Sequence, residues 1–253
     1  MRISLVSYLN TLPFRFAVNN SPLRLRNGSF LCCPPSDCAQ MLIDNKADIG
    51  LVPVAAILHL NEPVVFSDFC ISAHHEAYSV LILSQRPLRE CTTLLLDYQS
   101  RTSVAMCKIL DEHFLHYHFN YVDAAPGFEA QIQGNTAGLV IGDRAMHYRT
   151  NFEHVCDVGS LWLQYTGLPA VFALWVANKP LERSFVNEFN AIMQYGIDNI
   201  EHAIETYRGP DIGISLHRYL TECLCLNLDE ERIQSVRKFL QFLKPQCNLN
   251  IYP

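Results

Sequence analysis

The chain has 253 residues, of which 49% are hydrophobic and 17% charged, and its 19 Lys and Arg against 25 Asp and Glu give a formal net charge of −6. This composition is typical of a folded protein with a large core and excludes a disordered chain. The sequence has no basic stripe for nucleic acid, no polybasic segment for an anionic membrane and no apolar run of transmembrane length. We therefore expect neither nucleic acid nor a membrane as a partner.

The N-terminus and the cysteines indicate a cytoplasmic protein. Met1 and Arg2 lead straight into an apolar segment, without the hydrophobic region and small-residue cleavage site of a secretory signal. The ten cysteines are scattered, and no two CxxC units have the spacing of a zinc site. We therefore expect buried free thiols and no metal centre. The sequence leaves the oligomeric state open.

The first strand and the turn after it are the stretch around which we expect the ligand site to form. An apolar strand at Ile3–Val6 runs into a polar turn, and Pro13, a residue favoured in the first turn of a helix, opens the next segment. Because open α/β sheets bind ligands at the carboxyl ends of their strands, we predict that Asn10 faces a crevice. The alternative is that Asn10 only caps the helix beginning near Thr11.

Apolar strands and helical patterns alternate along the rest of the chain. We predict strands at residues 29–33, 48–52, 63–69, 78–83, 93–96, 117–122, 137–141, 155–158 and 169–177. We predict helices from residue 34, at 54–60, 104–117, 128–133 and 144–149, and from 181 onward, with Asp229 capping the last one. This alternation predicts an α/β fold with parallel sheets covered by helices.

The order of these elements predicts two lobes. One run of strands and helices ends near Ser84, a second starts near Thr93, and an apolar strand at 169–177 precedes a helical tail. We expect residues 1–84 and 172–253 to form one lobe and residues 85–171 the other. A two-lobed α/β protein binds its ligand in the cleft between the lobes.

Several strands end in polar turns, and the turn at 100–103 is the clearest candidate for an anion site. The start of a helix offers free amide groups, and Ser100, Thr102 and Ser103 add hydroxyls beside Arg101. The alternative is that Ser100 is only an N-cap and Arg101 a solvated side chain. Together with the turns after Val6, at Pro53, at Ser79 and at Gly142-Asp143, this one favours a small ligand that carries carboxylates.

Five motifs occur in order between residue 2 and residue 179: VSYLNTLPF from Val6, DIGLVPV from Asp48, LDYQSRTS from Leu96, IGDR from Ile141 and TGLPAVFA from Thr166. Together they resemble the menaquinone-biosynthesis chorismate dehydratase family. The resemblance implies the two-lobed fold of type 2 periplasmic solute-binding proteins, here without secretion. It also implies the loss of water from chorismate to give 3-[(1-carboxyvinyl)oxy]benzoate in the futalosine route.

The resemblance also implies roles for individual residues. It places Asn10 and Ser79 at the reacting end of the substrate, and Thr166 where it can close the cleft. It assigns the substrate carboxylates to Ser100, Thr102 and Ser103 and to the backbone around Gly142 and Asp143. No metal or redox cofactor is implied, because the ring becomes aromatic when water leaves. No histidine lies in the motifs, so the substrate's own side-chain carboxylate is our hypothesis for the proton acceptor.

Two places depart from the family pattern, and we expect both near the cleft. The chain has His75-Glu76-Ala77-Tyr78 where a Gly-Pro-Val-like stretch is expected before Ser79, and Ala170 where phenylalanine is expected. His75 or Tyr78 could refill the space left at Ala170. These departures leave two alternative functions. One is a cytosolic two-lobed binding protein or sensor for a small carboxylate. The other is a related enzyme that makes 1,4-dihydroxy-6-naphthoate or acts on another enolpyruvyl or futalosine-derived substrate.

Overall fold

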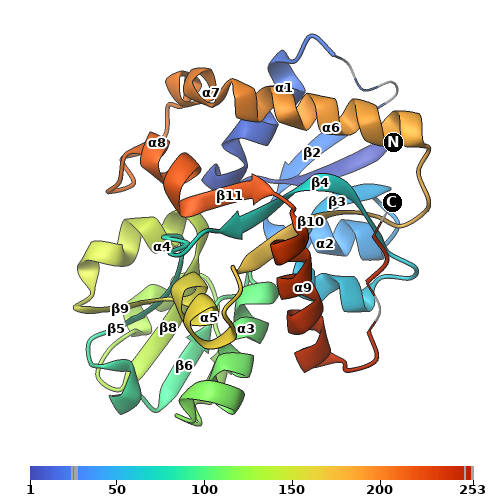
Figure 1. Cartoon of the computed structure of the whole chain (residues 1–253). Helices are drawn as coiled ribbons and strands as arrows, with labels where there is room; N and C mark the ends of the chain where they lie inside the picture. Colours follow the sequence, from blue (N-terminus) through green and yellow to red (C-terminus); the bar gives the residue numbers. More distant parts are fainter. Residues whose placement is uncertain (24, 26–27, 248, 252–253) are drawn as a thin grey trace.

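The chain folds into two lobes, each built on its own β-sheet. The computed structural model describes residues 1–23, 25, 28–247 and 249–251. One sheet has six strands in the order β11-β4-β10-β3-β1-β2, and the other has five in the order β7-β6-β8-β5-β9. Figure 1 shows the six-stranded sheet in the upper lobe and the five-stranded sheet in the lower one. The predicted α/β class is thus confirmed.

The first lobe contains the N-terminal and C-terminal parts of the chain. Its strands are β1 Arg2–Val6, β2 Ser29–Cys33, β3 Ile49–Pro53, β4 Val64–Ala73, β10 Val171–Ala177 and β11 Leu224–Asn227. Its helices are α1 Leu12–Asn20, α2 Pro35–Ile43, α6 Arg183–Asp198, α7 Ile200–Thr206 and α8 Leu216–Arg218. The ring of Trp175 packs edge-on against Phe14 and Phe189, with centroids 6.0 and 4.9 Å away. These buried aromatic rings join the sheet to α1 and α6.

The second lobe is formed by the middle of the chain. Its strands are β5 Val80–Ser84, β6 Thr93–Leu96, β7 Asn120–Asp123, β8 Thr136–Ile141 and β9 His154–Asp157, and its helices are α3 Thr102–Leu110, α4 Gly142–Tyr148 and α5 Val158–Thr166. The last helix, α9 Glu230–Leu243, begins at the predicted N-cap, where the Asp229 carboxylate accepts the Arg232 N–H at 3.0 Å. Helix α9 also joins the C-terminal part of the chain to α5, because the Trp162 indole donates to the Ser235 hydroxyl at 3.0 Å.

Short helical turns link these elements. They are η1 Leu9–Thr11, η2 Val54–His59, η3 Leu88–Glu90, η4 Asp111–Leu115, η5 Phe128–Gln131, η6 Arg149–Asn151 and η7 Tyr219–Cys223. No helix in the described ranges is both long enough and apolar enough to cross a membrane.

The sheets are mixed, so the prediction of parallel sheets is wrong for part of each lobe. Strand β1 is parallel to β2 and β3, but β10 is antiparallel to β3 and β4. In the second lobe β6 is parallel to β7 and β8, whereas β5 is antiparallel to β8 and β9. The reason is that the chain passes twice between the lobes. After the first passage β5 enters the second sheet, and after the second β10 re-enters the first sheet, each running opposite to its neighbours.

The first crossing comes earlier than the sequence suggested. Strand β5 pairs with β8 and β9, so the chain changes lobe at residues 74–79 and not at residue 84. An apolar run such as 80–84, buried on both faces, fits either sheet, and only pairing decides between them. The sequence pattern also does not predict strand β11 or helix α5. Leu224 continues a helical pattern, and residues 158–166 lack a clear apolar stripe with helical spacing.

The N-terminal strand carries a testable ion pair. The backbone N–H and a guanidinium nitrogen of Arg2 donate to the Asp48 carboxylate at 2.8 and 3.1 Å, and these bonds lower the pKa of Asp48 to about 2. A depressed carboxyl pKa stabilises the fold above the ordinary value of 3.8, and this stability is lost as pH falls towards 2.

We expect Asp48→Asn to remove that part of the acid sensitivity. Because the Arg2 side chain is 54% exposed, the contribution should be about 1 kcal/mol rather than the roughly 2.5 kcal/mol that a shift of nearly two pKa units would give in full. Denaturant unfolding of wild type and variant between about pH 5 and pH 2.5 measures it. Asp123→Asn, at the exposed end of β7, is the control, and an unchanged acid slope in Asp48→Asn would contradict the assignment.

Candidate functional site

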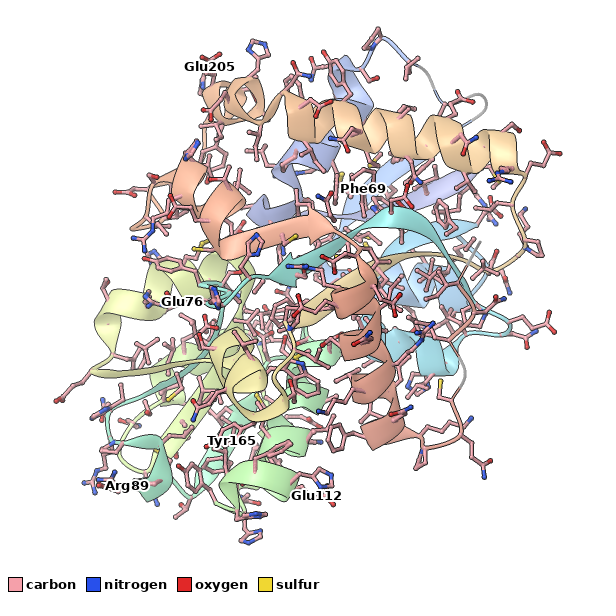
Figure 2. The ribbon with its side chains drawn as sticks, viewed as in Figure 1. Phe69, Glu76, Arg89, Glu112, Tyr165 and Glu205 are labelled. Carbon is pink, nitrogen blue, oxygen red and sulfur yellow. The ribbon has the colours of Figure 1, made fainter. Side chains whose placement is uncertain are left out.

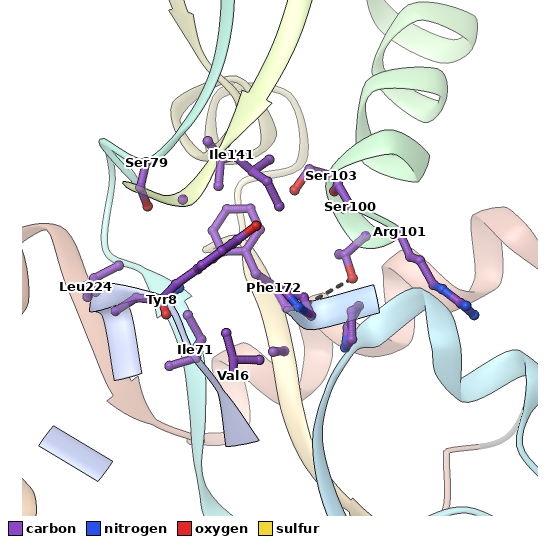
Figure 3. Close-up of a pocket in the computed structure, with 17 residues that line it drawn as sticks. Val6, Tyr8, Ile71, Ser79, Ser100, Arg101, Ser103, Ile141, Phe172 and Leu224 are labelled. Carbon is purple, nitrogen blue, oxygen red and sulfur yellow. Dashed lines mark hydrogen bonds between the residues drawn. The ribbon is translucent and has the colours of Figure 1, made fainter. Parts of the chain in front are cut away.

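A pocket of about 60 Å³ lies between the two lobes, where strands of both sheets end (Figure 3). Val6, Ile71 and Leu224 form apolar wall on the side of the first lobe, and Ile141 faces them from the second. The lining includes six of the residues that the sequence predicted for the site: Asn10, Ser79, Ser100, Thr102, Ser103 and Gly142. The volume holds a few water molecules.

Asn10 lies in the pocket wall and does not cap a helix. It sits in η1, and α1 begins after Thr11, whose hydroxyl donates back to the Val6 carbonyl at 2.6 Å instead of capping. The Oδ1 atom of Asn10 is buried and has no hydrogen-bond partner among the described residues. Leaving an amide oxygen buried and unpaired costs about 1–3 kcal/mol. Such an atom in a pocket wall is suited to a ligand's hydrogen-bond donor.

Ser79 is brought to the pocket by the crossing segment, which a single carboxylate holds in place. The Asp157 carboxylate accepts the N–H groups of Ala77 and Tyr78 at 3.0 and 2.8 Å, and burial raises the pKa of this carboxyl. Tyr78 has the left-handed φ of +62°, which turns the chain just before Ser79. Ser79 is 3% exposed, and its Oγ accepts a hydrogen bond from the Tyr219 hydroxyl at 2.8 Å.

The start of α3 forms the opposite wall. Figure 3 shows Ser100 and Ser103 on one side of the Tyr8 ring and Ser79 on the other. The first N–H groups of a helix have no partner within it and make its N-terminus attractive to anions. Arg101 does not add to this site, because its guanidinium extends away from Tyr8 and donates to Gln40 Oε1 at 3.2 Å.

Thr102 has a different use from the predicted one. Its hydroxyl donates to the Phe172 carbonyl at 2.9 Å and accepts the Ala55 N–H at 3.3 Å. Both partners belong to the first lobe, so Thr102 fastens α3 across the cleft. Its hydroxyl is therefore occupied within the protein, although the residue lines the pocket.

Gly142 and Asp143 bond to two different segments at the cleft. The Gly142 N–H donates to the Ser79 carbonyl at 2.8 Å, and Gly142 has a φ of +65°. The Asp143 carboxylate accepts the Leu9 N–H at 3.0 Å and lies outside the pocket lining. Burial raises the pKa of Asp143. Asp143 therefore fixes the backbone next to Asn10, a contact that the sequence did not predict.

Thr166, like Asp143, is a predicted site residue that does not line the pocket. It is the last residue of α5, its hydroxyl donates to the Trp162 carbonyl at 2.6 Å, and its own carbonyl accepts from Lys238 at 3.1 Å. These contacts end a helix and tie it to α9. The Thr166 hydroxyl is thus used within the protein, and closure of the cleft by Thr166 stays a prediction.

Tyr8 lines the pocket and makes polar contacts there, although it is not among the predicted site residues. Its hydroxyl donates to Gln99 Oε1 at 2.5 Å, across the cleft, and burial raises its pKa. Arg144 contacts the same oxygen at 3.3 Å and the Asp97 carboxylate at 2.6 Å. Burial raises the pKa of Asp97, and the charge of Arg144 opposes the rise. The available signal was that Tyr8, Gln99 and Arg144 all lie inside the quoted motifs.

The departures from the family pattern lie outside the pocket wall. His75 is exposed, and the Tyr78 hydroxyl donates to the Gly213 carbonyl at 3.2 Å. Figure 2 shows Glu76 at the border between the lobes, where it accepts from Arg149 at 2.6 Å. Ala170 is buried and does not line the pocket. The suggested refilling by His75 or Tyr78 is therefore wrong, because Phe172 supplies the aromatic wall (Figure 3).

The pocket can bind a small ligand by hydrogen bonds and apolar contact. Its lining offers an unpaired amide oxygen, serine hydroxyls and a helix start beside an apolar wall. In the described part of the chain no three His, Cys, Asp or Glu side chains are grouped as a metal site requires. This arrangement suits orientation and charge stabilisation of a bound molecule.

The whole chain is similar to known proteins in sequence. A family model described as menaquinone biosynthesis matches residues 1–245. A chorismate dehydratase from Thermus thermophilus is 24% identical over 229 residues, which cover 80% of this chain and 80% of that protein.

Solved structures share the fold. AF1704 from Archaeoglobus fulgidus has a TM-score of 0.74 at 13% identity, with 97% of each chain covered. The Candida albicans CA3427 gene product, described as having the generic periplasmic binding protein fold, has a TM-score of 0.65 at 13% identity, covering 99% of this chain and 92% of that one. These likenesses confirm the expected two-lobed binding-protein fold.

Gly142 offers a test of the pocket's packing. A Cβ at this position would lie 2.6 Å from the Tyr8 ring, whereas a Cβ at Gly167, whose φ is +73°, would meet open space. A left-handed backbone costs an alanine about 1–2 kcal/mol at either site. We expect Gly142→Ala to lose more stability than Gly167→Ala in denaturant unfolding, because Tyr8 must also move. Equal losses would show that the Tyr8 ring is not held in place.

Proposed function

The chain belongs to the menaquinone-biosynthesis family, and from this premise we propose that it is a hydro-lyase that dehydrates chorismate to 3-[(1-carboxyvinyl)oxy]benzoate, a step of the futalosine route. The observation that carries the proposal is the buried, unpaired Oδ1 of Asn10 in the wall of the cleft pocket. It lies within the motif that the resemblance places at the reacting end of the substrate.

The proposed reaction needs no redox change. One hydrogen leaves the ring carbon that carries the ether, the hydroxyl leaves the neighbouring carbon, and the two depart as water. The ring becomes aromatic, and negative charge that develops during proton loss spreads through the diene into the ring carboxylate. The protein must orient the substrate and stabilise that charge.

We propose that Asn10 and Ser79 act at the reacting end. The buried Asn10 Oδ1 is suited to accept a hydrogen bond from the hydroxyl that departs, and so to orient it. Ser79, which lies across the Tyr8 ring from Ser100 and Ser103 in Figure 3, is suited to an oxygen that gains negative charge. The apolar wall formed by Val6, Ile71 and Phe172 suits the face of the ring.

We propose that the start of α3 binds a carboxylate of the substrate. The serine hydroxyls of Ser100 and Ser103, together with the first amides of the helix, are chemically suited to an anion. The proposed second contact is the backbone around Gly142 and Asp143, through amides at the start of α4 other than the Gly142 N–H, which donates to the Ser79 carbonyl. The side chains of Thr102, Asp143 and Thr166 are left out of this set because they bond to the protein itself.

The proposed proton acceptor is the substrate's own side-chain carboxylate. Tyr8 and Arg101 are the ionisable side chains described in the pocket lining. Burial raises the pKa of Tyr8, so its phenol keeps its proton at neutral pH, and Arg101 is turned towards Gln40. Neither is suited to take a proton from the ring carbon.

We also propose that the lobes separate to admit the substrate and that the protein acts in the cytoplasm. The pocket of about 60 Å³ is closed by contacts such as Tyr8 to Gln99 and Leu9 to Asp143. A ring with two carboxylates needs more room than a few waters.

The cysteines support the proposed location in the cytoplasm. All ten are free thiols, which is typical of a reducing compartment.

The direct test is to mix the protein with chorismate and follow the ultraviolet spectrum and the product mass. We expect the loss of one water without an added cofactor. A raised melting temperature with chorismate but no product would instead support a binding protein or sensor. Turnover of a futalosine-derived substrate alone would support the related enzyme.

Two substitutions test the reacting end. Ser79→Ala removes a hydrogen bond to a charged group, and we expect kcat/KM to fall about tenfold to a hundredfold, or roughly 1.5–3 kcal/mol. Asn10→Ala should lose at least as much, mainly in kcat, if the carboxamide Nδ2 group donates to an oxygen whose negative charge develops only in the transition state. Ser160→Ala, whose hydroxyl contacts the His75 carbonyl outside the pocket, is the control. A loss confined to KM would reduce Asn10 to a binding residue.

A further inference from the structure

A tyrosine from the C-terminal part of the chain contacts the proposed catalytic serine. Tyr219 is fully buried, and its hydroxyl donates to Ser79 Oγ at 2.8 Å. The segment is well anchored, since the Ser215 hydroxyl caps the turn before it by accepting the Arg218 N–H at 3.0 Å. Strand β11 begins five residues after Tyr219, at Leu224, and pairs with β4, which leads into the crossing.

The direction of this hydrogen bond decides what Ser79 can do. The Tyr219 hydroxyl is the donor to Ser79 Oγ, and because burial raises the pKa of Tyr219, the phenol keeps the proton that this bond needs. A serine hydroxyl has one proton and two lone pairs. With one lone pair occupied by Tyr219, the Ser79 proton must point to another acceptor. The Ala77 carbonyl is 3.4 Å away, which is long for an O–H···O bond.

We propose that Tyr219 is a positioning residue that fixes the Ser79 hydroxyl as a hydrogen-bond donor to a substrate oxygen. This inference rests on the proposed function, because it assigns Ser79 to the reacting end of the same site. In this arrangement Ser79 does not take the proton from the ring. It donates a hydrogen bond to an oxygen that becomes more negative, and the bond from Tyr219 strengthens that donation by polarising the serine O–H.

The packing around Tyr219 makes a clean substitution possible. Its ring belongs to an apolar cluster that contains Leu9 and Leu12 from the first lobe and Met146 from the second. Tyr219→Phe keeps the ring in this cluster and removes only the hydroxyl. Tyr78→Phe is the matched control. It removes the hydroxyl of the residue next to Ser79, which donates to the Gly213 carbonyl and lies outside the pocket lining.

The experiment measures kcat and KM for chorismate in the full chain and its variants. We expect Tyr219→Phe to lower kcat about threefold to tenfold, with little change in KM, because the lost neutral hydrogen bond acts on the substrate only through the serine hydroxyl. In the Ser79→Ala background the same substitution should leave kcat unchanged, since its effect acts through the serine hydroxyl. A merely structural role would lower both backgrounds alike.

Each outcome decides between the inference and the proposed function. If wild type turns over chorismate and Tyr219→Phe matches it, or if the loss persists in Ser79→Ala, the positioning role is overturned and the proposed function stands. If Tyr78→Phe lowers kcat as much as Tyr219→Phe does, the effect belongs to the crossing segment and the inference also fails. Absence of turnover by wild type would overturn the proposed function, and with it the assignment of Ser79 to the substrate.

Discussion

The site depends on how the chain is held where it crosses from the first sheet to the second. The Asp157 carboxylate accepts two successive backbone N–H groups there, at Ala77 and Tyr78, and so fixes the turn that presents Ser79. The same carboxylate also caps α5 through the Ser160 N–H at 3.0 Å. A buried carboxylate must be hydrogen-bonded to be tolerated. The same hydrogen bonds satisfy both the buried Asp157 carboxylate and the backbone N–H groups of the crossing segment.

Contacts across the cleft join the lobes through groups that border the pocket. The Leu9 N–H bonds to Asp143, and the Tyr8 hydroxyl bonds to Gln99, so the first polar turn is held by the second lobe. In return, Thr102 of the second lobe bonds to the backbone of the first. Some side chains that the sequence predicts for the ligand therefore hold the lobes together. Fewer polar atoms remain free to bind the ligand than the sequence predicts.

The pocket combines one unpaired amide oxygen with an apolar wall and a helix start. That combination binds and orients, and it provides fixed dipoles where charge develops. The tail of the chain contributes to the same site through Tyr219, which lies 140 residues beyond Ser79. The C-terminal helices thus do more than cover the first sheet, because they place a donor behind the pocket wall.

The sequence by itself determined the α/β class, the two lobes, the cap at Asp229, the motifs that carry Asn10 and the start of α3, and Ser79 as a residue of the cleft. These follow from local patterns, namely apolar periodicity, turn residues and caps. It did not determine the antiparallel β5 and β10, the crossing at 74–79 or the contacts of Thr102 and Thr166. Only the tertiary structure decided these, because strand pairing and side-chain partners join residues far apart in the chain, and an apolar run or a hydroxyl carries no local sign of its distant partner.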